Sequence, residues 1–244
     1  MVKISVITPS VRKDGLDIVK KSLDNQTFRD FEWIVVSPFE YKNCDLWIPD
    51  PPKNEGDMYN LNKAWNAAFK QAQGKLFVSF VDMTWAPPDA LQQFWDHYEA
   101  NPQGLIGGVG NQYEEVIDDK PEILIWKDPR MRMDQGSFYE INPIDLEFCL
   151  TSVPKQAILD CGGLDEEFDK VAALSEKDMC LRLDKLGYRF YLDQSIEYRA
   201  LKHPRLTADW EERYQAGVKM FQEKLHNLNN GIRSPKVSPL TTDI

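Results

Sequence analysis

The residues best suited to chemistry lie where apolar runs of the sequence end. Asp82 follows the run 76–81, and Arg12 lies four residues beyond the run 4–8. In an open α/β sheet, ligands bind beyond the carboxyl ends of the strands, so these positions aim a carboxylate and a cation at a cleft. The same two ends supply further polar or small side chains, namely Thr8, Pro9, Ser10, Met83 and Thr84.

A second group of acids lies near the start of a predicted helix, in the segment Ser175–Asp178. Acids at a helix N-terminus often only cap it and complement its dipole, a role that suits Asp178. Glu176 lies just before the helix and can project into a cleft as a general base. His203 lies in a loop-like segment before Pro204, where it is either a ligand or simply an exposed histidine.

The composition narrows the function classes. The chain has 244 residues, 42% of them hydrophobic, and its net charge is −10. That charge argues against broad electrostatic binding of nucleic acid or anionic membranes, and leaves room for a local basic pocket. The four cysteines are widely spaced, without the short spacing of a zinc site or the density of a disulfide scaffold. Because no apolar run approaches the ~20 residues of a membrane span, we expect a soluble, cytoplasmic protein.

The elements that must position these residues alternate between strand and helix patterns. Short apolar runs predict strands, and apolar residues at helical spacing follow each run. This alternation predicts one Rossmann-like α/β domain with a mostly parallel central sheet flanked by helices. Residues 44–56 contain three prolines and are predicted to form a loop. The predicted strands are 4–8, 33–36 and 76–81, and the helices that follow them lie around residues 16–23, 61–72 and 90–98.

The second half of the sequence is less regular. Residues 105–150 show no clear period, whereas a helix around Met179 and a strand at 189–192 are predicted further on. A last amphipathic helix carries Trp210 and Phe221, and a loosely held tail is expected from Asn229. We therefore divide the chain into a domain with a nucleotide-binding half and an acceptor-binding half, followed by a helical extension. Their bounds are 1–100, 101–205 and 206–244.

Several segments, taken in order, resemble family 2 glycosyltransferases of the GT-A fold. The resemblance extends from about residue 3 to residue 205. It comprises the first strand with Pro9, the segments 22–28 and 31–36, Asn66 eight residues before Gly74, the segments 80–82 and 88–91, and the acceptor-side segments 162–168 and 175–183.

The resemblance implies a nucleotide-sugar donor held by Thr8, Pro9, Ser10 and Arg12, and by Asp82 and Met83. The family motif after the third strand has two acids flanking one residue, and its second acid binds a divalent cation such as Mn2+ or Mg2+. Here the motif is Asp82–Met83–Thr84, so a weaker hydroxyl ligand replaces that acid. The resemblance places the metal at Asp82 and Thr84, with a further ligand from His203.

The resemblance also implies the catalytic base and the nucleobase site. Glu176 occupies the position of the catalytic base of the family, with Asp178 as the next candidate, and the implied outcome is inversion in a single displacement. In the family the second strand ends in two acids, one of which contacts uracil, and Ser37–Pro38 stands there instead. Replacement hydrogen bonds are expected from the segment that opens the second helix, through Asp57, Asn60 and Asn62.

These inferences favour a metal-assisted glycosyltransferase that moves a sugar from a nucleotide-diphosphate donor, a UDP-sugar by family precedent, to an acceptor hydroxyl. The acceptor is a glycan, a protein side chain, a lipid-linked sugar or a modified nucleobase. One alternative is a degenerate module that binds a nucleotide or glycan without turnover, suggested by the missing acids. A nucleotidyltransferase is less favoured, because no glycine-rich phosphate loop follows the first strand.

Overall fold

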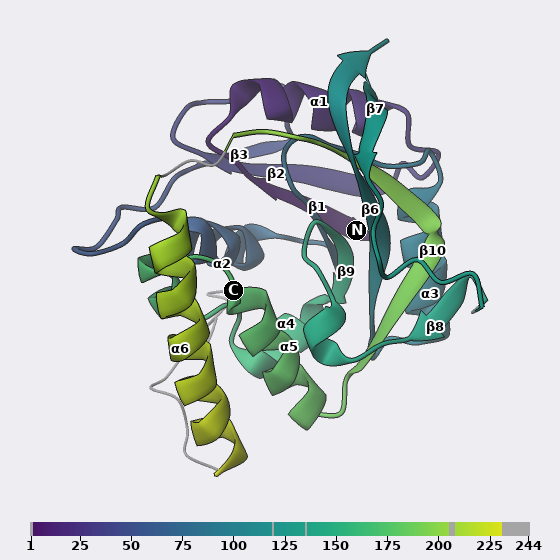
Figure 1. Cartoon of the computed structure of the whole chain (residues 1–244). Helices are drawn as coiled ribbons and strands as arrows, with labels where there is room; N and C mark the ends of the chain where they lie inside the picture. Colours follow the sequence, from purple (N-terminus) through teal and green to yellow (C-terminus); the bar gives the residue numbers. More distant parts are fainter. Residues whose placement is uncertain (1, 119, 135, 205–207, 231–244) are drawn as a thin grey trace.

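The computed structural model describes residues 2–118, 120–134, 136–204 and 208–230. In this part of the chain a ten-stranded sheet forms the middle layer, and helices cover both of its faces (Figure 1). The α/β architecture expected from the sequence is thereby confirmed. The strand order along the main path of the sheet is β3-β2-β1-β4-β9-β6-β10-β5.

The first half of the sheet is built from strand–helix units, as the hydrophobic pattern predicts. The strand β1 pairs in parallel with both β2 and β4, so the carboxyl ends of these strands lie at one edge. The bounds are β1 Ile4–Pro9, α1 Lys13–Asp24, β2 Phe31–Ser37, α2 Leu61–Gln71, β4 Leu76–Phe80 and α3 Ala90–Ala100.

The predicted loop 44–56 is wrong in one part, because it contains the strand β3 (Leu46–Pro49). This strand pairs in parallel with β2 and lies at the edge of the sheet. An edge strand needs ladder hydrogen bonds on one side alone, which is why Pro49 is tolerated at its end.

The second half of the sheet mixes strand directions. The strand β9 (Leu150–Pro154) is antiparallel to both β4 and β6, and so joins the two halves. The strand β10 runs parallel to β6, with an irregularity between Asp193 and Glu197. Residues 104–126 are thus more regular than their sequence suggested. The remaining strands are β5 Thr84–Trp85, β6 Gly104–Ile117, β7 Lys120–Trp126, β8 Phe138–Glu140 and β10 Arg189–Leu201.

The last helix, α6 (Trp210–Asn229), lies against the helix α5, which spans Ser175–Lys185 (Figure 1). Its Lys224 is buried and donates to the carboxylates of Asp165 and Glu167, each at 2.7 Å. The predicted tail beyond this helix, residues 231–244, lies outside the described residues. The other helical elements are α4 Lys155–Cys161, α5 Ser175–Lys185 and the short 3-10 helices η1 Pro143–Asp145 and η2 Glu166–Lys170.

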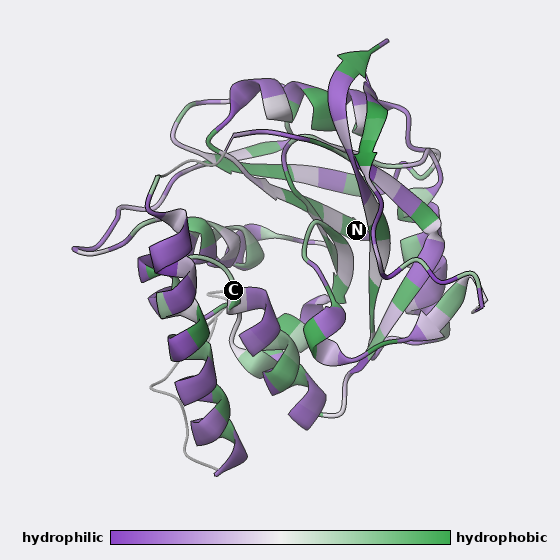
Figure 2. Cartoon of the chain, in the orientation of Figure 1, coloured by the Kyte–Doolittle hydropathy of each residue, from purple (hydrophilic) through white to green (hydrophobic). Residues whose placement is uncertain are grey.

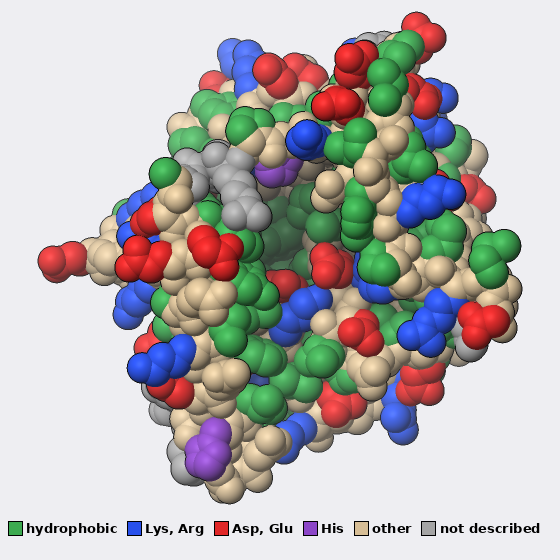
Figure 3. All heavy atoms as spheres, in the orientation of Figure 1, with side chains coloured by type: hydrophobic (Ala, Val, Ile, Leu, Met, Phe, Trp, Pro, Cys, Tyr) green, Lys and Arg blue, Asp and Glu red, His purple; other side chains and the backbone are tan. Residues whose placement is uncertain are grey.

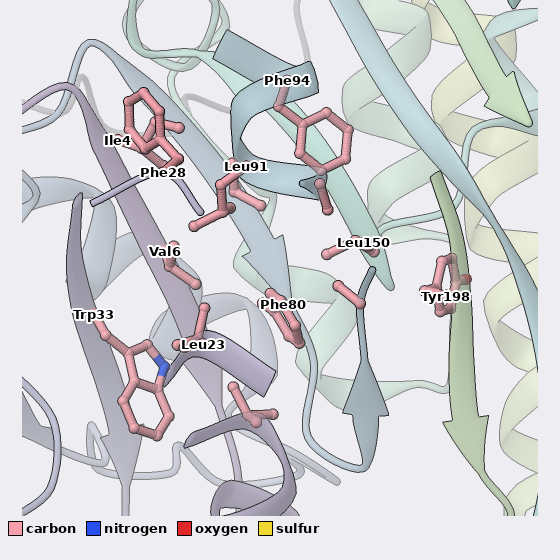
Figure 4. Packing of buried hydrophobic residues seen from close by; sticks show 14 of the residues in the cluster. Ile4, Val6, Leu23, Phe28, Trp33, Phe80, Leu91, Phe94, Leu150 and Tyr198 are labelled. Carbon is pink, nitrogen blue, oxygen red and sulfur yellow. The ribbon is translucent and has the colours of Figure 1, made fainter. Parts of the chain in front are cut away.

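Two apolar cores fill the spaces between the sheet and its helices. On one face, side chains of α1 and α3 pack on β1, β2 and β4, and Figure 4 shows Val6, Leu23, Phe80, Leu91 and Phe94 directed toward one another. On the other face α2, α4 and α5 pack on the same sheet. The outward sides of the helices are mostly hydrophilic (Figure 2). The sheet is therefore fixed from both sides, and its strand ends are held in place.

Candidate active site

The ends of β1 and β4 meet through a compact polar contact. The hydroxyl of Ser10 donates to Oδ2 of Asp82 at 2.6 Å, and Nη1 of Arg12 lies 3.3 Å from the same oxygen. Ser10 Oγ also accepts the backbone N–H of Arg12 at 2.9 Å, which fixes the loop between β1 and α1. The structure thus brings together three of the predicted donor-binding residues, as expected for neighbouring parallel strands.

The turn after β4 is held close to the first turn of α1. Met83 has a left-handed backbone with φ of 62°, and its N–H donates to the carbonyl of Gly15 at 3.3 Å. A Cβ at Gly15 would lie 2.9 Å from Cβ of Asp82 and 3.1 Å from the nitrogen of Met83. A residue without a side chain is therefore required at position 15 for this approach.

Strand pairing brings the turn after Asp82 against the end of β10. The strand β5 lies antiparallel to β10, with Thr84 opposite Ala200, and the N–H of Leu201 donates to the carbonyl of Met83 at 2.8 Å. His203, which is exposed, follows Leu201 by two residues in the sequence. Thr84 is fully buried, and its hydroxyl lies 3.4 Å from the backbone oxygen of Asp82.

Thr8 and Pro9 have different surroundings from Ser10. The hydroxyl of Thr8 is fully buried, donates to the carbonyl of Phe80 at 2.6 Å and accepts from the indole N–H of Trp33 at 3.0 Å. Pro9 is the last residue of β1 and pairs with Val36. These two residues hold strands together, and the first side chain after β1 that reaches the Asp82 contact is Ser10.

The start of α2 contains Asp57 and Asn62, both predicted to contact the nucleotide. The carboxylate of Asp57 pairs with Lys63, and although burial opposes it, this hydrogen bond holds the pKa of Asp57 below its usual range. The N–H and side-chain amide of Asn62 donate to Oδ1 of Asp169 at 2.8 and 2.9 Å. Burial raises the pKa of Asp169 to about 6, although these hydrogen bonds lower it. The amide oxygen of Asn62 is buried and has no hydrogen-bond partner among the residues that the structure describes.

Glu176 lies on the first turn of α5, close to the end of β4. The N–H of Val81, the residue before Asp82, donates to the carbonyl of Cys149 at 3.0 Å. Burial raises the pKa of the Cys149 thiol, and the carboxylates of Glu147 and Glu176 add to the rise. Burial raises the pKa of Glu176, the carboxylate of Glu147 adds to the rise, and the ammonium of Lys177 opposes it.

Asp178 is placed differently, although it lies two residues further along the same helix. Its Oδ2 accepts from Nε of Arg182 at 2.9 Å, and the carboxylate is buried. The same guanidinium donates to the carbonyls of Cys161 and Gly163 at 2.6 and 2.9 Å. Asp178 therefore orients an arginine that holds the turn after α4.

The loop before Glu176 has an unusual backbone. Ala173 and Leu174 have φ values of 64° and 73°, a region that residues with side chains seldom adopt. On its outer side, α6 holds this loop, because the N–H of Ala172 donates to the carbonyl of Arg213 at 3.2 Å. A Cβ at Gly217 would lie 2.5 Å from the carbonyl oxygen of Ala172. The position of Glu176 thus depends on the contact with α6.

The face of the molecule seen in Figure 3 is hollowed in its middle. The floor of the hollow is mostly hydrophobic, acidic and basic side chains line its lower edge, and a histidine lies at its upper rim. A separate cavity of about 410 Å³ opens between β8, η1 and the end of α5, with Arg132, Asn142, Asp184 and Arg189 in its wall. Because none of the predicted site residues lines that cavity, we place the candidate site at the strand ends.

Two residues of the site were not identified from the sequence. Gly15 permits the approach of α1 to Asp82, and Asp169 holds the start of α2 from a position 107 residues away from Asn62. The glycine at the start of a predicted helix was a usable signal, because glycine is unfavourable there unless another group must come close. Asp169 lies among other acids in 165–169, and nothing in that spacing marks it.

Comparisons with known proteins concern the fold. No protein-family model matches the sequence, and no curated protein matches it. Among solved structures, S. aureus TarS residues 1–349 in complex with UDP superposes with a TM-score of 0.60 at 14% identity, covering 92% of this chain and 66% of that one. GalNAc-T7 with UDP, GalNAc and Mn2+ superposes with a TM-score of 0.64 at 9% identity, covering 91% of this chain and 50% of that one.

The chain has the GT-A glycosyltransferase fold. It spans about two thirds and half of the lengths of the two GT-A structures, respectively, so the likeness concerns this fold and not their whole activities. Both of these structures contain UDP, and one contains Mn2+. In the described part of this GT-A chain, no helix has both the length and the apolar character needed to cross a membrane.

Proposed function

We propose that the protein is an inverting glycosyltransferase that moves a sugar from a nucleotide-diphosphate donor to an acceptor hydroxyl. The observation that carries the proposal is the Ser10–Arg12–Asp82 contact at the ends of β1 and β4, together with Glu176 on the first turn of α5, a carboxylate whose pKa burial raises. The GT-A fold supports it, because two structures of this fold hold UDP. A uridine donor and a cytoplasmic location stay predictions.

In this reaction the carboxylate of Glu176 takes the proton of the acceptor hydroxyl. The acceptor oxygen attacks the anomeric carbon, the bond from that carbon to the phosphate oxygen breaks, and the nucleoside diphosphate leaves from the opposite face. A raised pKa makes Glu176 a stronger base than a water-exposed glutamate, once it is ionised. The donor contacts come from Ser10, Arg12 and Asp82, with Asn62 contributing at the start of α2.

The role of Glu176 is tested with Glu176→Gln, which removes the base but preserves size. We expect kcat to fall by roughly 10²–10⁴-fold while the donor dissociation constant stays nearly unchanged, because the variant loses a proton acceptor and no nucleotide contact. Transfer is measured with a panel of nucleotide sugars and acceptors, and donor binding by calorimetry. Glu99→Gln, an exposed acid of α3, is the matched control and should keep full activity.

The other outcomes assign the function differently. Full activity in Glu176→Gln contradicts its role as the base, and Asp178→Asn would then be compared with it. Donor binding without transfer for every sugar and acceptor pair favours the alternative of a binding module. That alternative draws on the acids of the family pattern that are missing here, at the end of the second strand, at Thr84 and at Ser175.

A further inference from the structure

The atoms around Asp82 are poorly suited to a divalent cation. Mg2+ and Mn2+ sites use carboxylate oxygens together with substrate phosphates. Oδ2 of Asp82 already accepts from the hydroxyl of Ser10 at 2.6 Å and faces the guanidinium of Arg12 at 3.3 Å. The second expected ligand, Thr84, is fully buried and its hydroxyl points to a backbone oxygen. A divalent ion would thus find one carboxylate here, that of Asp82, which is already paired with the guanidinium of Arg12.

The wider surroundings add no further set of ligands. Within residues 2–118, 120–134, 136–204 and 208–230, no group of three or more His, Cys, Asp and Glu side chains is arranged to hold a metal ion. His203 is exposed, so water solvates its ring. A dication bound at Asp82 would also lie close to the charge of Arg12, and like charges repel.

Arg12 itself has the chemistry to meet a diphosphate. A guanidinium carries five N–H donors in a planar fork that matches phosphate oxygens, and the contact with Asp82 involves one of its three nitrogens. Its side chain is 20% exposed against 11% for Asp82, so Arg12 lies on the more open side of the pair. Arg12 also caps the N-terminus of α1 without a side-chain hydrogen bond to that end, where the helix dipole favours negative charge.

We propose that Arg12 takes the place of a divalent cation, so that donor binding and sugar transfer are independent of metal. This inference rests on the proposed function. When the bond between the anomeric carbon and the phosphate oxygen breaks, its electron pair stays on that oxygen, and the guanidinium of Arg12 stabilises the added charge. Asp82 and Ser10 keep Arg12 in position. The acceptor proton goes to Glu176, so atoms and charge balance without a metal.

The test measures the binding of nucleoside diphosphates by calorimetry, with EDTA present and then with Mn2+ or Mg2+. The panel contains uridine, guanosine, adenosine, cytidine and thymidine diphosphates, because the base is not assigned. For the nucleoside diphosphate of this panel that binds, we expect the affinity to be the same within about twofold with and without metal. Arg12→Ala should weaken it by at least about tenfold, which corresponds to 1.4 kcal/mol. Arg12→Lys should recover part of the loss, because the charge returns without the fork.

Arg29→Ala, which changes an exposed arginine, is the control and should bind as the wild type does. If Arg12→Ala does not fold, Arg12→Gln gives the same comparison with a longer neutral side chain. Titration of the wild type with Mn2+ alone, followed by electron paramagnetic resonance, should show no bound ion at stoichiometric concentration.

Two results separate the inference from the proposed function. Diphosphate binding that requires Mn2+ or Mg2+, with Arg12→Ala unaffected, overturns the inference and leaves the glycosyltransferase proposal standing. Absence of binding by every nucleoside diphosphate, with or without metal, overturns both.

Discussion

Glu176 combines two properties that a catalytic base needs. Its carboxylate lies 3.5 Å from the hydroxyl of Ser175, and no ion pair with Lys177 is formed, since that ammonium donates to the carbonyl of Leu146 and lies 3.5 Å from Glu147. Burial then disfavours the charged form and raises its pKa. The same residue is consequently a cost to the stability of the fold.

That cost predicts a pH-dependent effect of Glu176→Gln on stability. As pH rises, the unfolded glutamate loses its proton first, so the folded state binds more protons and the free energy of unfolding falls. The loss is complete above the folded pKa. We expect the variant to gain stability relative to the wild type as pH rises above about 4, the ordinary pKa of a glutamate, as measured by urea unfolding of both proteins. Parallel stability curves over this range would contradict the burial of a charged Glu176.

Single residues show what sequence reasoning can find at a site and what it misses. The types and spacing identified Ser10, Arg12 and Asp82, because strand ends converge wherever strands run parallel. Hydrogen-bond partners depend on the folded chain, and two side chains show this. Asp178 is paired with Arg182, and the amide nitrogen of Asn62 is committed to Asp169. The first pairing has the i, i+4 spacing of neighbours on a helix, whereas the second joins residues 107 positions apart and does not follow from periodicity.

At the scale of elements, the contact between α6 and the loop 171–174 connects a distant helix to the base. Gly217 lets α6 approach the carbonyl of Ala172, and Nη1 of Arg213 donates to the carbonyl of Lys170 at 3.1 Å. The loop has two consecutive left-handed residues, a conformation that persists where surrounding contacts hold it. A substitution in α6 that displaces this loop should therefore also displace Glu176.

We predict that Gly217→Ala lowers kcat several-fold and leaves the dissociation constant of the donor nearly unchanged. The new methyl group would lie 2.5 Å from the carbonyl oxygen of Ala172, so the loop before Glu176 must shift, whereas the Asp82 contact lies on other elements. Steady-state kinetics and calorimetry measure the two quantities. Gly136→Ala, at a glycine with open space around it, is the matched control. An equal loss of kcat in both variants would contradict the positioning role.

The elements themselves were predictable to different degrees. The three strand–helix units of the first half follow from their apolar spacing, because each helix has one buried face. The strand β6 was missed, since four glycines lie in residues 104–110 and glycine is depleted in strands. The short strand β3 was missed because of its prolines. In both cases pairing with neighbouring strands outweighed local propensity.

At the scale of the whole molecule, the net charge of −10 makes a further prediction. A protein with this charge lacks the broad basic surface that binds polyanions, even if Arg12 serves one diphosphate locally. We expect no measurable binding to duplex DNA or heparin at about 0.15 M salt, because at this concentration only charges in close contact attract one another effectively. Fluorescence anisotropy measures the binding of each polymer. Salt-dependent binding to either polymer would reopen an extended polyanionic acceptor.

The approach of α1 to the Asp82 turn limits how this site can vary. Gly15 has an ordinary negative φ, so its requirement comes from Cβ of Asp82 and the backbone of Met83, and not from its own conformation. A side chain at position 15 would become tolerable only together with a compensating shift of that turn. A substitution at position 15 thus depends sterically on positions 82 and 83, although positions 15 and 82 lie 67 positions apart in the sequence.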